Sequence, residues 1–207
     1  MPTLNRMPVL LATGSIAIPV AEALVALPSA VLQRIEASPI EPDLADTAAF
    51  SEAYGFPVSG GANCIVVAGK RGDTVTYAAC VVLASTKLDV NRTVKGLLGA
   101  RKVSFAPMDD AVERTRMEYG GITPIGLPAD WAVYVDSRVL EAPEVVIGAG
   151  VRGAKLFLPG ALLAELPRVE VVEGLAVEPG PPASPAAPAP PTGPTGPTGP
   201  TEPAPSA

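Results

Sequence analysis

A segment rich in glycine and proline interrupts an otherwise regular pattern of helices and strands. Three glycines and two prolines fall within nine residues, from Gly120 to Pro128. This composition is incompatible with a helix or strand interior, because glycine weakens both and proline lacks a backbone donor. Gly120 and Gly121 leave no side chains in front of their amides. The segment is predicted to be a rigid loop, either a connector with two tight turns or a holder of a carbonyl oxygen or oxyanion.

The segments on both sides of this loop predict a single mixed, largely antiparallel sheet with flanking helices, of the α/β class. Apolar runs at 62–68 and 74–83, separated by a basic turn, predict a β-hairpin. Asp89 is expected to cap a helix that ends before Gly99. Other helices are expected at 19–27, 46–54, 107–114 and 159–166, and other strands at 102–105, 132–135, 144–147, 155–158 and 169–172.

The C-terminal part of the chain has a different composition. Residues 177–207 contain twelve of the 25 prolines and a short run of Pro-Thr-Gly repeats. Proline at this density prevents helix and sheet formation, and no apolar periodicity remains to be buried. We therefore expect a domain at 1–176 and a disordered tail at 177–207. The tail is a linker, a strip that binds a partner, or a segment without function.

The chain contains no histidine, which restricts its chemistry. Ser-His-Asp and Cys-His mechanisms are excluded, together with most zinc and haem ligation patterns. We expect no metal and no cofactor. Cys64 and Cys80 are the only cysteines, and the hairpin should bring them close together as free thiols. Cys64 is a conceivable nucleophile, but a buried structural role is favoured for an apolar thiol without a histidine partner.

Residues 7–32 are apolar enough to suggest a signal peptide, but Pro19, Glu22 and Pro28 interrupt the run. A helix of the mature protein is the preferred interpretation. No segment offers about 18 unbroken apolar residues. The expected location is therefore the cytoplasm, with no membrane partner.

Positive charge is concentrated in one segment of an acidic chain. The formal net charge is −6, yet residues 70–102 contain seven Lys and Arg against two Asp, a local balance of 7 − 2 = +5. Such a segment favours contact with phosphates, and it is equally typical of a solvated hairpin tip and helix face.

Three motifs together resemble the YbaK/EbsC family of editing domains associated with prolyl-tRNA synthetase. The loop from Gly120 to Gly126 (GGITPIG) is similar to the family's Gly-Gly-(Val/Ile)-(Ser/Thr)-Pro-(Ile/Leu)-Gly loop. Leu98–Val103 (LGARKV) is similar to its LGAKKV segment, and Gly150–Gly153 (GVRG) to its GKRG turn. Order and spacing agree from roughly Ala62 to Leu166.

The resemblance implies a deacylase that hydrolyses the ester of a wrong, small amino acid on tRNA. In such enzymes the loop holds the aminoacyl ester, and a hydroxyl at the end of the tRNA helps to activate the attack. The implied catalytic positions are Asn63, Gly120, Gly121, Ile122, Thr123 and Pro124. The implied substrate-binding positions are Cys64, Gly148, Arg152, Lys155, Lys70, Arg71, Arg92 and Lys95.

The chain departs from the family pattern at several pocket positions. Asn63 occupies the place of the usual lysine and Cys64 that of a frequent threonine. Gly148 replaces a frequent serine, and Lys155 a frequent acidic residue. Lys155 either supplies the cation that position 63 lacks or is a solvated lysine at a strand end, and the second interpretation is slightly favoured.

Two functions remain open at this point. The first is a free-standing editing deacylase that acts on mischarged tRNA. The second is a catalytically weakened relative that binds a small ligand, an aminoacyl-nucleotide end or a protein. The expected partners are the tRNA acceptor end and, further, prolyl-tRNA synthetase or another synthetase, with the chain as monomer or homodimer. Trp131 and the pair Asp136 and Arg138 either line the pocket or serve as a core aromatic and a surface ion pair.

Overall fold

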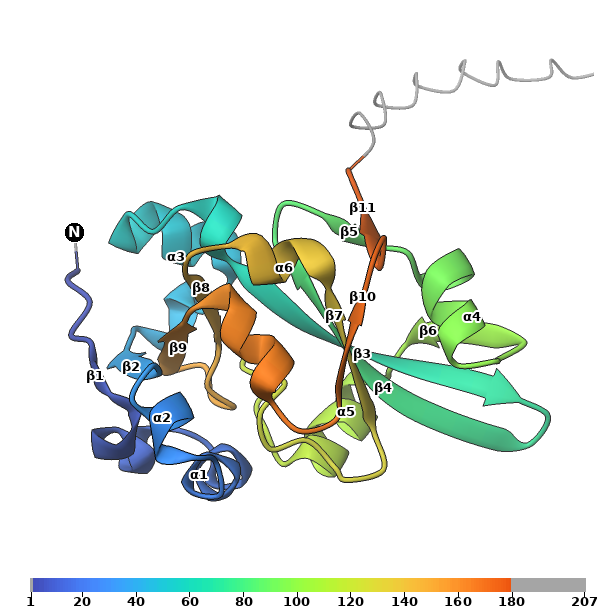
Figure 1. The fold of residues 1–207 in the computed structure, drawn as a ribbon, viewed down its shortest axis with the longest axis horizontal. Coiled ribbons are helices and arrows are strands. Elements are labelled where there is room, and N and C mark those ends of the chain that lie inside the picture. The colour runs from blue at the N-terminus through green and yellow to red at the C-terminus, as the bar shows by residue number, and fades with distance from the viewer. Residues whose placement is uncertain (1, 180–207) are drawn as a thin grey trace, which may run out of the picture.

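The structure is a computed structural model that describes residues 2–179. Its strands form two main sheets and one small ribbon (Figure 1). The five-stranded sheet has the order β10 (Val169–Val172), β7 (Ala132–Asp136), β4 (Thr74–Leu83), β3 (Ala62–Arg71), β6 (Lys102–Phe105). The four-stranded sheet has the order β1 (Met7–Pro8), β2 (Glu36–Pro39), β9 (Ala154–Leu158), β8 (Val145–Gly148). The ribbon pairs β11 (Ala176–Val177) with β5 (Lys87–Leu88).

Helices cover the sheets and are mostly short. The α-helices are α1 (Ile18–Val25), α2 (Ser29–Leu32), α3 (Thr47–Tyr54), α4 (Lys95–Leu97), α5 (Met108–Thr115) and α6 (Ser137–Glu141). The 3-10 helices are η1 (Val9–Leu11), η2 (Thr13–Ser15), η3 (Pro42–Leu44), η4 (Val58–Gly60) and η6 (Gly160–Glu165), and η5 (Val90–Val94) is a π-helical turn. Asp89 caps η5 as expected, because its carboxylate accepts hydrogen bonds from the Arg92 and Thr93 amides.

The mixed α/β class is confirmed, but the strands do not form one sheet. An isolated parallel bridge between Gly61 and Val146 joins the two main sheets. Most pairings are antiparallel, and β7 is parallel to both β4 and β10. The main core lies between the two sheets, and it is built largely from Val, Leu, Ile and Ala. Alternation along β4 turns Ala79 and Val81 into this core, while Cys80 and Val82 face a second cluster beneath η5.

The two cysteines differ from the expectation. Cys64 pairs with Val81, and Cys80 pairs with Ile65. Because neighbouring positions on a strand point to opposite faces, the two thiols lie on opposite sides of the sheet. They are free, and burial raises the pKa of Cys80 to about 12.

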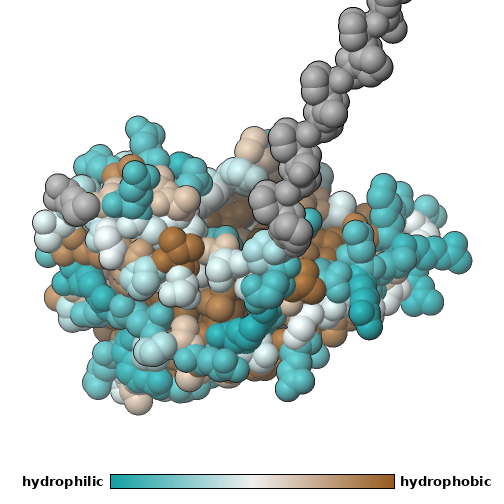
Figure 2. Space-filling model, turned by 90° about the horizontal axis from the view of Figure 1, so that it is seen from above, coloured by the Kyte–Doolittle hydropathy of each residue, from teal (hydrophilic) through white to brown (hydrophobic). Residues whose placement is uncertain are grey.

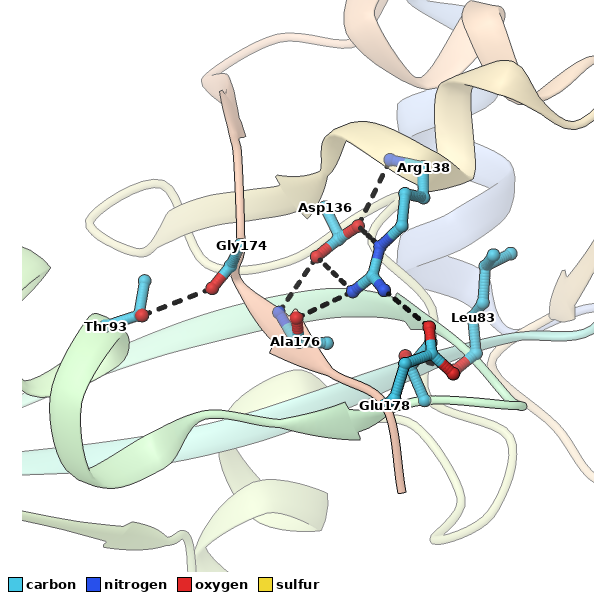
Figure 3. Close-up of polar contacts among 8 residues, drawn as sticks. Leu83, Thr93, Asp136, Arg138, Gly174, Ala176 and Glu178 are labelled. Atoms are coloured by element: carbon cyan, nitrogen blue, oxygen red, sulfur yellow. Dashed lines mark hydrogen bonds and ion pairs between the residues drawn. The ribbon is translucent and has the colours of Figure 1, made fainter. Parts of the chain in front are cut away.

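Hydrogen bonds hold the C-terminal segment against η5, β7 and α6 (Figure 3), and β11 pairs with β5. Asp136 is 1% exposed and accepts hydrogen bonds from Arg138 and from the Ala176 amide. Burial alone would raise the pKa of Asp136, but these hydrogen bonds outweigh burial and lower it. Arg138 also pairs with Glu178 at 3.1 Å. Ordered contacts thus extend past residue 176, where we expected the domain to end, and residues 180–207 lie outside the described residues.

Candidate active site

A pocket of about 510 Å³ lies where the two sheets meet. Its walls come from the start of α3, the first half of β3, the end of β6, the loop after α5, and strands β8 and β9. The volume falls in the range of small-molecule sites. Of the residues chosen from the sequence, Asn63, Cys64, Gly120, Ile122, Gly148 and Lys155 line it.

The first half of β3 forms an open edge of the five-stranded sheet at this pocket. Strand β6 pairs only with Val67–Lys70, so within residues 2–179 the preceding residues of β3 have no neighbouring strand on that side beyond the single bridge at Gly61. Asn63 is exposed on this edge and accepts a hydrogen bond of 2.8 Å from the Thr47 hydroxyl. Among the described residues no acceptor is found for the Asn63 NH₂ group, which has two N–H donors.

Backbone hydrogen bonds attach the glycine-proline loop to the turn at 150–152. The Glu118 amide donates to the Gly150 carbonyl at 2.8 Å, and the Gly150 amide donates to the Gly121 carbonyl at 2.7 Å. The Glu118 carboxylate accepts from the Arg152 amide at 2.6 Å. The glycine-proline loop with the preceding Glu118 and the turn at 150–152 are therefore adjacent in the fold, although these hydrogen bonds join residues 29 to 34 positions apart along the chain. Sequence reasoning missed the part that Glu118 plays here.

Glycine is required at two points because backbone segments approach very closely. A Cβ atom on Gly121 would lie 2.6 Å from the Val151 carbonyl, and one on Gly148 would lie 2.2 Å from the Gly121 carbonyl. Gly148 therefore occupies the frequent serine position because the loop passes directly over β8. The loop predicted from the sequence is present, and its backbone packs closely against β8 and the turn.

The loop presents fewer groups to the pocket than its sequence suggests. Gly120 and Ile122 line the pocket, whereas Gly121 packs on the turn and its amide donates to Glu118 at 2.9 Å. Thr123 and Pro124 are buried on the other side of the loop. In the described part of the chain no acceptor is found for the Gly120 amide or the Ile122 amide. Both residues line the pocket, so these two amides are the candidate donors of the loop.

Lys155 differs from the solvated lysine that we favoured. It is only 7% exposed, and its Nζ donates to the Ala45 carbonyl at 2.7 Å. Burial lowers the pKa of Lys155 to about 8. Strand alternation places Lys155 with Phe157 on the side of α3. Lys155 contacts Ala45, which lies 110 positions earlier in the sequence. The local sequence of β9 therefore could not predict that this lysine is buried.

Cys64 forms part of the pocket wall without the properties of a nucleophile. It is partly buried, and burial raises the pKa of its thiol. A raised pKa keeps the thiol protonated and weakens it as a nucleophile. The structural role favoured from the sequence agrees with this environment.

Two aromatic side chains at the pocket were not identified from the sequence. Phe105 is 62% exposed and Tyr119 is 59% exposed, and both line the pocket. Exposed aromatic faces are suited to stacking on a nucleobase. Trp131, in contrast, is a core residue stacked on Tyr77 at 5.4 Å.

The basic residues lie away from the pocket. Lys70 and Arg71 lie at the end of the β3–β4 hairpin, which extends to the right in Figure 1. Lys70 pairs in register with Lys102, and the Arg101 amide donates to the Lys70 carbonyl. Arg92 and Lys95 lie on η5 and α4, and all these side chains are exposed. This end of the molecule is largely hydrophilic in Figure 2. We call Lys70, Arg71, Arg101 and Lys102 the hairpin cluster.

No helix within residues 2–179 is long and apolar enough to cross a membrane. No group of three or more His, Cys, Asp or Glu side chains in this range is placed to hold a metal ion. Arg152, expected to bind substrate, lies beside the pocket, with its guanidinium 4.0 Å from Asp46.

Comparison with solved structures shows the fold. A hypothetical protein of known crystal structure is similar with a TM-score of 0.62 and 23% identity, covering 70% of this chain and 93% of its own. A candidate trans-editing enzyme for prolyl-tRNA synthetase is similar with a TM-score of 0.61 and 22% identity, covering 75% of this chain and 93% of its own. A designed epitope scaffold gives a TM-score of 0.60 at 20% identity.

Comparison with protein families shows which family this chain belongs to. Residues 41–166 match the aminoacyl-tRNA editing domain. This range contains the pocket, the glycine-proline loop and the hairpin cluster, and it makes up more than half of the chain. The chain therefore belongs to the family of aminoacyl-tRNA editing domains of the YbaK type.

Proposed function

We propose that this protein hydrolyses the ester bond of tRNA that carries a wrong, small amino acid. The observation that carries the proposal is the pocket at the sheet junction. It combines the Ile122 amide, the Asn63 NH₂ group and two exposed aromatic side chains in one cavity. These are the donors and the stacking surfaces that an aminoacylated nucleotide end requires.

The reaction needs a water molecule, a donor for the developing oxyanion and a leaving group. Water attacks the ester carbonyl carbon, and the bond between that carbon and the tRNA hydroxyl oxygen breaks. The products are a free amino acid and a tRNA with a free hydroxyl. The Ile122 amide is the proposed donor to the oxyanion, and Asn63, oriented by Thr47, is the proposed second donor.

Proton transfer is assigned to the substrate. The chain has no histidine, and the Cys64 thiol stays protonated. We therefore assign activation of the water to the free hydroxyl of the terminal ribose, as the family resemblance implies. The phosphates of the acceptor arm are assigned to the hairpin cluster, whose exposed cations are matched to a polyanion.

The second candidate function is ligand binding without turnover. It is favoured by one observation: position 63 carries an uncharged amide whose oxygen is already engaged by Thr47. In this account the pocket binds an aminoacyl-nucleotide end but hydrolyses it no faster than water does.

A deacylation assay separates the two functions. We would follow release of amino acid from tRNAs charged with alanine, cysteine, serine, threonine or proline. We expect faster release from at least one of them, and a loss of about 10²-fold in Asn63→Ala if its amide stabilises the oxyanion. Asn91→Ala, an exposed asparagine on η5, is the matched control and should leave the rate unchanged. Binding without acceleration on every tRNA would establish the second function instead.

A further inference from the structure

Lys155 is a buried cation inside the pocket. Its neighbours on β9, Ala154 and Leu156, turn into the main core, whereas Lys155 points toward the start of α3. The side chain is 7% exposed, yet it contributes to the pocket wall. Among the ion pairs found within residues 2–179, none includes Lys155. The pocket therefore contains a desolvated positive charge without a contacting carboxylate.

The contacts of Lys155 use only part of its donor capacity. An ammonium group has three N–H donors. One is directed at the Ala45 carbonyl at 2.7 Å, and the Phe50 ring centroid lies 5.8 Å from Nζ. A purely structural lysine that ties Ala45 to β9 would account for this one donor. It would not account for a charged group placed on a cavity surface with donors left over.

The charged groups around Lys155 neutralise it only in part, because burial lowers the pKa of Lys155 more than the nearby Asp46 carboxylate raises it. Asp46 precedes α3, its side chain is 76% exposed, and it lies 4.0 Å from the Arg152 guanidinium. Arg152 adds a second positive charge next to the pocket. Cys64 on β3 faces the same cavity as a neutral thiol, because burial raises its pKa. Since a buried charge is costly unless it is paired, the missing partner is expected to come with the ligand.

We propose that the Lys155 ammonium is an anion-binding group in the pocket and holds a negatively charged oxygen of the ligand. This proposal rests on the proposed function, because it concerns the same pocket. Two parts of an aminoacylated tRNA end carry such an oxygen: the phosphate of the terminal nucleotide and a carboxylate on the amino acid side chain. In either case the cation reaches the ligand from β9, whereas Asn63 lies on β3, and both side chains contact the chain at the start of α3.

Paired probes that differ by one charge test the proposal and identify the oxygen. We would measure the Kd of AMP against adenosine, and that of an amide-linked aspartyl-adenosine against its asparaginyl counterpart. If the phosphate is bound, the wild-type protein should bind AMP at least about tenfold more tightly than adenosine. If the side-chain carboxylate is bound, the aspartyl compound should be favoured instead. Equal affinity within both pairs would overturn the proposal.

Lys155→Met and Lys155→Arg test whether this side chain is the cause. Met has a similar length without charge, so the preference for the anionic probe should disappear, while Arg should restore part of it. Retention of the full preference in Lys155→Met would overturn the proposal. Melting temperatures establish that both variants are folded.

A measurement on the wild-type protein does not depend on the variants folding. The ¹³Cε resonance of Lys155 reports its ionisation, and the other lysines, Lys70, Lys87, Lys95 and Lys102, are all exposed. Burial lowers the pKa of Lys155 to about 8, so a bound anion should raise that pKa. Affinity for AMP should fall as the pH rises through 8, while the AMP phosphate, with a second pKa of about 6, stays fully charged. An unchanged Lys155 pKa in the presence of saturating AMP and of saturating aspartyl compound would contradict the proposal.

These outcomes are separable from those of the proposed function, because none of the binding measurements needs turnover. An inactive protein that still discriminates the charged probe would disprove the deacylase and leave the anion site in place. An active protein that binds the charged and the neutral probe of each pair equally well would support the deacylase and disprove the anion site.

Discussion

Strand β3 passes through two contrasting environments. Its first half borders the pocket, where added Cβ atoms on Gly121 or Gly148 would lie within 2.6 Å of backbone atoms. Its second half ends in the hairpin cluster, where the side chains are exposed and cationic. Close packing therefore restricts the size of side chains at the pocket end of β3, whereas the hairpin end is characterised by its positive charge. Small increases in side-chain volume should reduce activity at the pocket end, and changes of charge should reduce tRNA binding at the hairpin end.

The largest effect is expected from Gly148→Ala. The new Cβ atom would collide with the Gly121 carbonyl, so the loop must move. Overpacking of this kind costs about 1–3 kcal/mol of unfolding free energy. Displacement of the Ile122 amide should lower deacylation about 10²–10³-fold. Thermal unfolding and the deacylation assay measure the two effects.

Gly96→Ala is the matched control for this substitution. Gly96 is exposed on α4, and nothing lies within 4 Å of an added Cβ atom. It should leave the activity unchanged and stabilise the fold slightly. If the two alanine variants behave alike, the close approach of loop and strand is not what positions the amide.

A smaller effect is expected from charge reversal at the hairpin end. Lys70→Glu combined with Lys102→Glu removes two paired cations. We expect tRNA affinity at low salt to fall about tenfold or more, with a shallower dependence of log K on log salt. Hydrolysis of a short aminoacyl-adenosine ester should be unchanged, because the cluster lies outside the pocket. The matched control, Lys70→Arg combined with Lys102→Arg, keeps both charges and should bind tRNA as the wild type does. If charge reversal leaves tRNA affinity unchanged, the hairpin cluster is only a solvated surface.

The same contrast explains how far the sequence was predictive. The β3–β4 hairpin, the Asp89 cap and the rigid loop follow from local patterns of alternation, capping and turn residues. The division into two sheets does not, since pairing between β2 and β9 is set by contacts over more than a hundred positions. The five-residue helix α6 was missed, although Asp136, which caps it, was a usable signal.

The sequence predicted which residues line the pocket better than it predicted what each of them does there. The sequence identified Asn63, Gly148 and Lys155 as departures from the family pattern, and all three line the pocket. It could not show that Gly148 makes room for a carbonyl group, or that Ala45 accepts a hydrogen bond from a buried Lys155. Both facts depend on backbone carbonyl groups that lie far away in the sequence. Every residue has such a carbonyl group, so the identity of the side chain does not reveal the contact.

Asn63→Lys should reduce activity modestly. The new side chain removes the acceptor of the Thr47 hydroxyl and adds a second cation to the pocket of Lys155. The new ammonium group still offers a donor to the oxyanion, so the net loss is the Thr47 hydrogen bond of about 1 kcal/mol, which corresponds to about a fivefold lower rate. Asn63→Asp keeps an acceptor for Thr47 but replaces the NH₂ donor with a negative charge, so it should lower the rate further than Asn63→Lys does. A higher rate in Asn63→Lys would show instead that the natural protein is a weakened enzyme.

The smallest effect is expected from shortening the chain after Pro179. Composition predicts that the melting temperature changes by less than about 1 °C, because residues 180–207 have little apolar surface to bury. A chain that ends at Glu173 is the contrasting variant, since it loses the fully buried Leu175 and the Ala176 amide bound to Asp136. It should melt about 5–10 °C lower. A large loss on the first truncation would show that the tail contacts the domain.

The most direct test is to map two ligands on the amide resonances of the wild-type protein. The first ligand is an alanyl-adenosine with a non-hydrolysable amide link, and the second is an acceptor-stem minihelix with the same end. The short ligand should shift residues that line the pocket, among them Asn63, Gly120 and Ile122, and the minihelix should in addition shift Lys70, Arg71 and Lys102. Shifts at the hairpin cluster with the short ligand, or an unperturbed pocket with both ligands, would contradict a pocket for the ester and a separate surface for the phosphates.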